Sequence, residues 1–261
     1  MSDRIARTLA LSLLLVALPA FAQKTLRIAA AADLQPLLPP LLAQFEHETG
    51  IHPDASYQSS ATLATQIIDG APFDLFLAAD LSFPQRVIDA GRAEEAKPMP
   101  YARGTLVLWT RNDSGAPLTL DALRTDAIKT IAIANPEHAP YGRAAVAALK
   151  QAGLYDQLKS KLVIGENISQ AAQFVQSGSA QAGIVALSLA LSPAMKDGHR
   201  WLVPENLYPP LDQSVVILKS SANKAAAKAF LEFLRTPDAQ STLSRYGFTL
   251  PAGVATKSTK S

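Results

Sequence analysis

The sequence contains no cysteine in its 261 residues. Thiolate catalysis, disulfide bonds, metal sites with Cys ligands and a lipid anchor on cysteine are therefore excluded. An excess of charge of one sign is also lacking, since 24 basic and 22 acidic side chains leave a formal net charge of +2. A chain this close to neutral has no electrostatic footprint for nucleic acid. Its apolar content of 48% can build a large core in one or two domains.

Long apolar runs are scarce, and the one that stands out covers residues 8–21. Its length of about 14 residues is too short to span a bilayer comfortably. Arg4 and Arg7 precede it, and Ala20-Phe21-Ala22 supplies small residues at the two positions that signal peptidase reads. We therefore expect residues 1–22 to be a cleavable secretory signal peptide, in preference to an uncleaved anchor, and the mature protein to be free in the periplasm.

Apolar segments of strand length alternate with segments of helical periodicity along the rest of the chain. This alternation predicts an α/β fold with mainly parallel sheets. Two apolar strands break the pattern, at 105–110 and 214–218, and we expect them to cross between two domains. The predicted division is a discontinuous lobe 1 at 24–104 plus 216–252, lobe 2 at 105–215 and a flexible tail at 253–261. The other segments are predicted as strands at 25–31, 130–134, 162–164 and 183–187 and as helices at 34–50, 82–91, 143–151, 224–235 and 237–245.

The clearest local unit is 56–80, where strand, polar turn, helix, turn and strand follow one another. Apolar residues recur at helical spacing after Ser59 and Ser60, so one of these serines should be the N-cap. The first amides of the helix then have no acceptor inside it, and together with the helix dipole they favour a small anion. Two serines at a helix start are more often a cap without a ligand. The prediction of a site therefore depends on how many similar corners the chain has.

Five strand-to-helix corners are small and polar, and none carries Lys or Arg at its tip: Ala32-Asp33, Ser59-Ser60, Pro140-Tyr141-Gly142, Asn167-Ile168-Ser169 and Ser188. Ligands of open α/β sheets bind beyond the carboxyl ends of the strands, where such corners meet. Neutral N–H and O–H donors can hold a fully ionised oxyanion, but they disfavour a protonated one whose own O–H would face another donor. The corners therefore favour molybdate or sulfate over phosphate near neutral pH.

Three titratable residues near these corners have simpler interpretations. Asp33 is expected to be an N-cap of the helix predicted at 34–50. His138 is a lone histidine, so we interpret it as a loop residue bonded to nearby backbone. Asp74 has no His or second carboxylate placed to work with it, and we interpret it as a residue that holds a turn at the start of a strand.

Several motifs carry a resemblance to a known family: AAAADL at 29–34, SSATLATQI followed by GAPFDLFLAAD, NPEHAPYGRAA, GENISQAAQFV and GIVALSLA. Together they resemble the molybdate-binding periplasmic proteins of ABC importers, over nearly all of the mature chain. The resemblance implies a type II periplasmic binding fold, with two mixed β-sheets flanked by helices and two crossover strands. It also implies a monomeric receptor that binds molybdate or tungstate between its lobes and delivers it to a membrane permease, without a cofactor and without a catalytic residue.

The resemblance further implies which residues hold the oxyanion through main-chain amides and hydroxyls: Ala32, Asp33, Ser59, Ser60, Tyr141 and Ile168. The chain departs from one branch of the family, which has Ser in place of Asp33 and a Tyr hydroxyl in place of Ala186. A carboxylate aimed at a dianion would be repulsive. We therefore expect the Asp33 side chain to turn away and cap its own helix, and Tyr141 or Ser188 to replace the missing hydroxyl.

Other functions have less support in the sequence. An enzyme on the same kind of fold would need a nucleophile elbow, a metal motif or a Gly-rich nucleotide loop, and we find none. A ferric-iron receptor would need several converging anionic side chains, whereas only Asp33 and Glu166 lie near the corners. A receptor for another oxyanion such as sulfate remains the main alternative.

Overall fold

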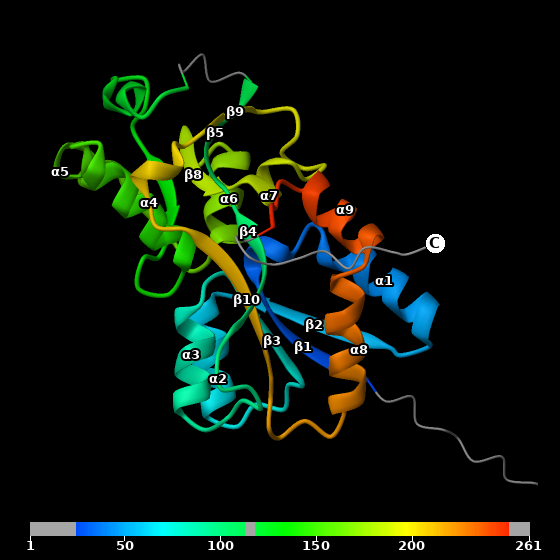
Figure 1. The fold of residues 1–261 in the computed structure, drawn as a ribbon. Coiled ribbons are helices and arrows are strands. Elements are labelled where there is room, and N and C mark those ends of the chain that lie inside the picture. The colour runs from blue at the N-terminus through cyan, green and yellow to red at the C-terminus, as the bar shows by residue number, and fades with distance from the viewer. Residues whose placement is uncertain (1–24, 113–117, 251–261) are drawn as a thin grey trace, which may run out of the picture.

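The structure is a computed structural model that describes residues 25–112 and 118–250 (Figure 1). The predicted signal peptide and tail lie outside these residues. The described chain forms two five-stranded sheets, ordered β2-β1-β3-β10-β4 and β7-β6-β8-β5-β9. The strands of the first sheet are β1 Leu26–Ala31, β2 Pro53–Gln58, β3 Leu75–Ala78, β4 Met99–Gly104 and β10 Leu211–Ile217, and those of the second are β5 Leu106–Thr110, β6 Ile131–Ala134, β7 Leu162–Gly165, β8 Ala182–Ala186 and β9 His199–Leu202.

Both sheets are mixed, which confirms the fold class but corrects the expectation of mainly parallel pairing. β1 pairs in parallel with β2 and β3, and β6 pairs in parallel with β7 and β8. β10 is antiparallel to β3 and β4, and β5 is antiparallel to β8 and β9. The parallel strands each end at a corner that leads into a helix, so the pairing places these corners along one edge of each sheet.

Helices cover the sheets and supply the other half of each core. In the first sheet, α2 and α3 lie on one face and α1, α8 and α9 on the other (Figure 1). Phe45 of α1 packs edge-on against Phe230 of α8, with ring centroids 5.2 Å apart. The helices are α1 Leu38–Thr49, α2 Ser60–Ile68, α3 Ser82–Asp89, α4 Pro140–Gln151, α5 Tyr155–Leu158, α6 Ile168–Gln176, α7 Leu187–Ala190, α8 Lys224–Leu234 and α9 Pro237–Arg245.

The two sheets are joined where β4 passes through Thr105 into β5 and where the chain returns after β9 to β10. β5 belongs to the second sheet and β10 to the first, so neither predicted crossover strand is shared between sheets. β10 also carries an irregularity in its pairing with β4, between Gln213 and Ser214. The predicted boundary between residues 215 and 216 falls within β10, Leu211–Ile217, which belongs to the first sheet along its whole length. The division into two lobes stays a prediction.

The helix predicted at 34–50 begins later than expected. A 3-10 turn occupies Ala32–Leu34, and α1 begins only at Leu38, without a side-chain cap. A continuous helix from Leu34 would place Pro39 and Pro40 beyond its first turn, where each would lack an N–H donor. Starting at Leu38 puts both prolines in the first turn, where no donor is needed. The predicted end is confirmed, because Gly50 is left-handed with φ of 70°.

The start of α3 is capped by a residue that precedes the helix. Ser82 is the first residue of the helix, not its cap. The Asp80 carboxylate takes the capping role instead, since its Oδ1 accepts from the Phe83 amide at 3.2 Å and its Oδ2 from the Ser82 hydroxyl at 2.5 Å. A carboxylate at this position also complements the helix dipole.

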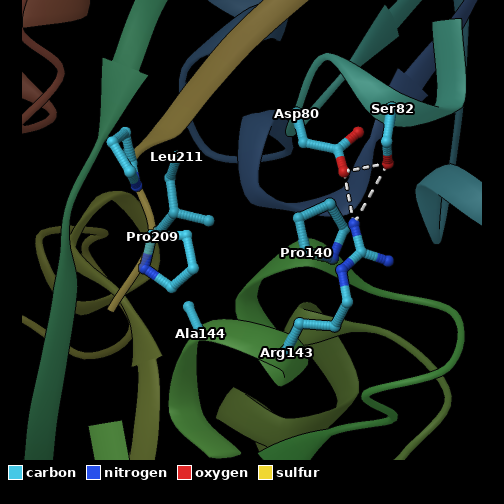
Figure 2. A pocket seen from close by; sticks show the side chains of 8 residues that line it. Asp80, Ser82, Pro140, Arg143, Ala144, Pro209 and Leu211 are labelled. Atoms are coloured by element: carbon cyan, nitrogen blue, oxygen red, sulfur yellow. Dashed lines mark hydrogen bonds and ion pairs between the residues drawn. The ribbon is translucent and has the colours of Figure 1, made fainter. Parts of the chain in front are cut away.

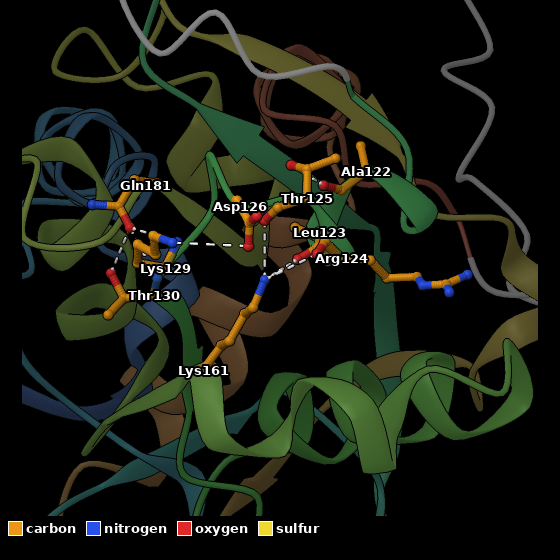
Figure 3. Close-up of polar contacts among 9 residues, drawn as sticks. All are labelled: Ala122, Leu123, Arg124, Thr125, Asp126, Lys129, Thr130, Lys161 and Gln181. Carbon is orange, nitrogen blue, oxygen red and sulfur yellow. Dashed lines mark hydrogen bonds and ion pairs between the residues drawn. The ribbon is translucent and has the colours of Figure 1, made fainter.

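One surface lysine ties the second sheet to the segment before it. Lys161 Nζ donates to the carbonyls of Leu123, Arg124 and Thr125 at 3.0–3.2 Å (Figure 3). These carbonyls end a short 3-10 turn, Asp121–Arg124, and a cation is the favoured partner for such a terminus. Lys161 therefore stabilises the local fold through these three hydrogen bonds.

Candidate functional site

The predicted corners meet at one small cavity between the two sheets. It is lined by all six of the principal residues that the sequence analysis selected, Ala32, Asp33, Ser59, Ser60, Tyr141 and Ile168. The other lining residues, Ala31, Gln58, Ala79, Ala139, Pro140 and Asn167, were not among these six, although Pro140 and Asn167 belong to the predicted corners. Most of these are immediate chain neighbours of the selected ones. Ala79, which follows β3, is the exception that only the fold brings there.

The start of α2 offers both a hydroxyl and an amide. Ser59 is the N-cap, and its Oγ accepts from the Thr62 amide at 3.2 Å. Ser60 is the first helical residue, so its N–H has no acceptor within the helix. The Ser60 hydroxyl oxygen accepts from the Ala79 amide at 3.1 Å, which orients it and leaves its own proton for another acceptor. Cap and donor roles are therefore divided between the two serines.

Two further helices begin at the cavity. α4 starts with Pro140, and the Tyr141 and Gly142 amides follow in its first turn, without a side-chain cap. α6 starts at Ile168, where the Asn167 side chain accepts from the Gln170 amide at 3.0 Å and leaves the Ile168 amide free of the helix. With α2, three helices of nine to twelve residues thus point their N-termini at the cavity. Their unpaired amides and dipoles favour a bound anion.

Gly142 permits the close approach of α4 to the strand before it. A Cβ at this position would lie 2.3 Å from the Ala134 carbonyl oxygen and 2.8 Å from two backbone carbons. No real Cβ makes such a contact with backbone, so a side chain here would displace the start of α4. The position of the Tyr141 amide at the cavity therefore depends on this glycine.

Asp33 is fully buried and does not cap a helix, which corrects the expectation from the sequence. Its Oδ2 accepts from Gln213 Nε2 of β10 at 2.8 Å, so the carboxylate has turned toward the first sheet and not toward the start of α1. Burial raises the pKa of Asp33 to about 7, against smaller lowering effects of the Tyr141 hydroxyl, the Asp33 N–H and Gln213. The Tyr141 hydroxyl is near enough to act on this pKa, but it does not meet the geometry of a hydrogen bond.

Neither hydroxyl that we considered as a replacement for the one missing at Ala186 is directed into the cavity. Ser188 is not among the lining residues, and its Oγ donates to the Asp33 carbonyl at 2.7 Å. The Tyr141 hydroxyl lies against Gly104, where a Cβ would approach it to 2.0 Å. Ala186 itself is fully buried at the start of α7. The donors that the structure offers to the cavity are therefore mainly backbone amides and the Ser60 hydroxyl.

Contacts between the two sheets close around the cavity. The Ala61 amide donates to the His138 carbonyl at 3.1 Å, and Ser169 Oγ donates to Gln35 Oε1 at 2.7 Å. Arg143 of α4 forms an ion pair with Asp80 and also reaches Ser82 (Figure 2). These contacts join segments that are far apart in sequence, and they hold the helix starts around the same space.

The Arg143 guanidinium is drawn away from the cavity by this ion pair. Its carbon lies 4.9 Å from the centre of the Phe83 ring, and its nitrogen is bonded to Asp80. Arg143 is also absent from the residues that line the cavity. The donors of the site are therefore neutral, although Arg143 is only two residues after Tyr141.

Asp74 and His138 lie where their structural interpretations place them, but the His138 ring contacts side chains and not the backbone. The Asp74 carboxylate accepts from the Arg27 amide, the Ser221 hydroxyl and the Asn223 amide group, so it ties β1 and β3 to the segment before α8. His138 lies in the loop before α4, with its Nδ1 3.3 Å from the Asn135 side chain and 3.7 Å from Glu166. Both residues serve the local fold.

Within residues 25–112 and 118–250, no group of three or more His, Asp or Glu side chains could hold a metal ion. In the same part of the chain, no helix is long and apolar enough to cross a membrane.

Comparison with known sequences places the chain among relatives of one kind. The model of the family described as bacterial extracellular solute-binding protein matches residues 26–249. The molybdate-binding protein ModA of Rhodobacter capsulatus is 39% identical over 233 residues, which cover 89% of this chain and 91% of that protein. The protein of the same name from Azotobacter vinelandii is 38% identical over 230 residues, or 86% and 89% of the two chains.

Solved structures give the same picture of the fold. The periplasmic molybdate-binding protein of Azotobacter vinelandii superposes with a TM-score of 0.81 at 34% identity and covers 87% of this chain and 99% of its own. The sulfate-binding protein SubI of Mycobacterium tuberculosis reaches a TM-score of 0.74 at 17% identity, covering 88% of each chain, which shows a shared fold alone.

Proposed function

Since the chain belongs to the family of bacterial extracellular solute-binding proteins, we propose that it is a periplasmic receptor that binds molybdate and tungstate and delivers them to the permease of an ABC importer. One observation carries the proposal: the N-termini of α2, α4 and α6 converge on a small cavity that no Lys or Arg lines. The molybdate-binding relatives at 38–39% identity supply the identity of the anion. The cavity serves binding, and the chain is not an enzyme.

In this proposal the oxyanion accepts hydrogen bonds from the amides of Ala32, Asp33, Ser60, Tyr141 and Ile168 and from the Ser60 hydroxyl, while Ser59 shapes the site as the cap of α2. Each hydrogen bond to an ionised oxygen contributes roughly 1.5–3 kcal/mol. Several such bonds in a closed cavity support tight binding without a cationic side chain. The contacts between the two sheets support a closed arrangement in which the bound anion is screened from water.

The donor-only character of the site supports discrimination against phosphate. Near neutral pH, phosphate carries a proton that would face one of these N–H or O–H donors, whereas molybdate, tungstate and sulfate carry none. Sulfate is smaller, so selection against it has to come from the size of the cavity. The main alternative function is a receptor for sulfate, and a preference for molybdate over sulfate would argue against it.

Thermal unfolding of the mature protein with single oxyanions tests the function. Ligand at about a thousand times its dissociation constant stabilises the fold by roughly 4 kcal/mol. For a protein of this size we expect molybdate and tungstate to raise the Tm by roughly 8–16 °C. Sulfate and phosphate at the same concentration should change it by about 2 °C or less. An equal shift with sulfate would contradict the assignment to molybdate, and the absence of any shift would contradict the receptor function.

Replacing Ser60 with alanine separates its donor role from the capping role of Ser59. Ser60→Ala removes one hydroxyl donor, so molybdate affinity measured by calorimetry should fall about 10- to 100-fold. Ser59→Ala is the matched control. It should lower the free energy of unfolding by about 1 kcal/mol through loss of the N-cap, and it should weaken binding far less. The assignment of the donor would be wrong if Ser59→Ala lost more affinity than Ser60→Ala.

A further inference from the structure

Asp33 belongs to a cluster of buried polar side chains next to the cavity, which we name the Asp33 cluster: Asp33, Tyr101 of β4, Tyr141 of α4 and Gln213 of β10. Asp33 and Gln213 are 0% exposed. One hydrogen bond joins cluster members, from Gln213 Nε2 to Asp33 Oδ2 at 2.8 Å. The other four polar atoms have no partner: Asp33 Oδ1, Tyr101 Oη, Tyr141 Oη and Gln213 Oε1. A set of unpaired atoms this concentrated is rare in a protein interior.

The elements packed around Asp33 offer it no positive charge. They present the phenols of Tyr101 and Tyr141, the Gln213 amide and, from α7, the Ser188 hydroxyl, which bonds the Asp33 carbonyl. Burial holds the pKa of both phenols well above the usual value, so they stay neutral. Arg103 of β4 and Arg143 of α4 are already paired, Arg103 with Asp212 at 2.6 Å and Arg143 with Asp80. Within the described residues, an ionised Asp33 would thus be a buried charge without a counter-ion.

The position of Asp33 makes this charge relevant to binding. Asp33 lines the cavity, and its carboxylate is buried next to that cavity. A dianion held in the cavity therefore lies beside the carboxylate. In an interior of low dielectric constant the two negative charges repel each other strongly. The neutral form of the Asp33 carboxyl group is therefore favoured more strongly in the anion-bound protein than in the free protein.

We propose that Asp33 takes up one proton from solvent when the oxyanion binds, so that the loaded receptor holds a neutral carboxylic acid beside the anion. The inference rests on the proposed function. It makes Asp33 a residue that couples the affinity for the oxyanion to pH. No group other than the proton is transferred, and the anion itself stays fully ionised.

The proton has a defined place in the Asp33 cluster. Oδ2 already accepts from Gln213, so the proton resides on Oδ1. As a donor, Oδ1 then has an acceptor in the phenolic oxygen of Tyr141, which acts on the pKa of Asp33 and has no other partner. Protonation therefore satisfies an unpaired atom at the same time as it removes the repulsion.

This coupling predicts the pH dependence of binding. The pKa of Asp33 is about 7 in the free protein. Below about pH 6 the carboxyl group is already protonated, and affinity should be constant. Above pH 7 each pH unit should weaken binding by close to tenfold, which gives roughly 30-fold between pH 6 and pH 8.5.

Calorimetry of molybdate binding in buffers of different ionisation enthalpy measures the protons taken up. With the mature protein we expect close to one proton at pH 8.5 and about a tenth of a proton at pH 6. Asp33→Asn should take up none at pH 8.5, and its affinity should no longer depend on pH. An infrared difference spectrum of the unmutated protein on binding at pH 8.5 should gain the carbonyl band of a protonated carboxyl group.

His138→Gln is the matched control, because His138 is an ionisable side chain in the loop before α4, 3.7 Å from Glu166, and it lies outside the proposed donor set. The variant should retain the proton uptake. Molybdate binding without uptake in the unmutated protein would overturn the proton coupling and leave the receptor function intact. Uptake that persists in Asp33→Asn would overturn the assignment to Asp33. The absence of molybdate binding at every pH would overturn the proposed function itself.

Discussion

Replacing Gly142 with alanine is expected to weaken molybdate binding by at least about 100-fold, the equivalent of losing one or two charge-assisted hydrogen bonds. The added Cβ would lie 2.3 Å from the Ala134 carbonyl oxygen, in rigid backbone, so the first turn of α4 must move. That turn carries the Tyr141 amide. Isothermal titration calorimetry measures the affinity, and denaturant unfolding measures the accompanying loss of stability.

The other end of α4 offers the control for this prediction. Gly153 adopts φ of +70° just after the helix, and an added Cβ would meet nothing within 4 Å. Gly153→Ala should therefore cost about 1 kcal/mol of stability through backbone strain, with molybdate affinity retained. If both variants lost affinity equally, general destabilisation of α4 would explain the effect, and the role given to its N-terminus would be contradicted.

Replacing Asp33 with asparagine is expected to stabilise the ligand-free protein by roughly 3–4 kcal/mol at pH 8, and much less at pH 5. Burial raises the pKa of Asp33 from 3.8 to about 7. The folded state therefore keeps a proton that the unfolded state loses, and stability falls as pH rises from about 4 to about 7. Asparagine has no proton to lose and keeps an oxygen for Gln213 Nε2. Urea unfolding across this pH range measures the effect.

Asp156→Asn is the control for the loss of one acidic group. Its side chain is 88% exposed and pairs with Lys159 on the surface, so the variant should follow the pH profile of the parent protein. A parent protein whose stability did not fall between pH 5 and pH 8, or fell equally in Asp33→Asn, would show that Asp33 is ionised in the fold at little cost.

The fold could be predicted where the periodicity of the sequence is strong, whereas two of the four edge strands were missed. The predicted strands that became β1, β6 and β8 are apolar runs buried within the sheets. β4 and β9 were missed, and both are edge strands, with the sequences MPYARG and HRWL. An edge strand has one unpaired side, so it tolerates proline and charge, and its pattern does not separate it from a loop.

The helix starts around the cavity could be predicted from the sequence, because a helix N-terminus depends on residues that are close together in the chain. Ser59 caps α2, Asn167 caps α6 and Pro140 opens α4, each as residue type and spacing indicate. Asp33 was misplaced for the complementary reason. A capping carboxylate and a buried one have the same local sequence, and the choice between them lay with prolines that delayed α1 and with Gln213, which is 180 residues away.

The sequence by itself therefore determined the class of fold, the unpaired amides at the helix starts and the neutral character of their tips, since each depends on residues within one or two turns of each other. The tertiary structure alone decided the burial of Asp33, the direction of the Tyr141 hydroxyl and the pairing of Arg143 with Asp80 outside the cavity. Burial and charge pairing are sums over groups from distant segments, so they exist only once both sheets have brought those segments together.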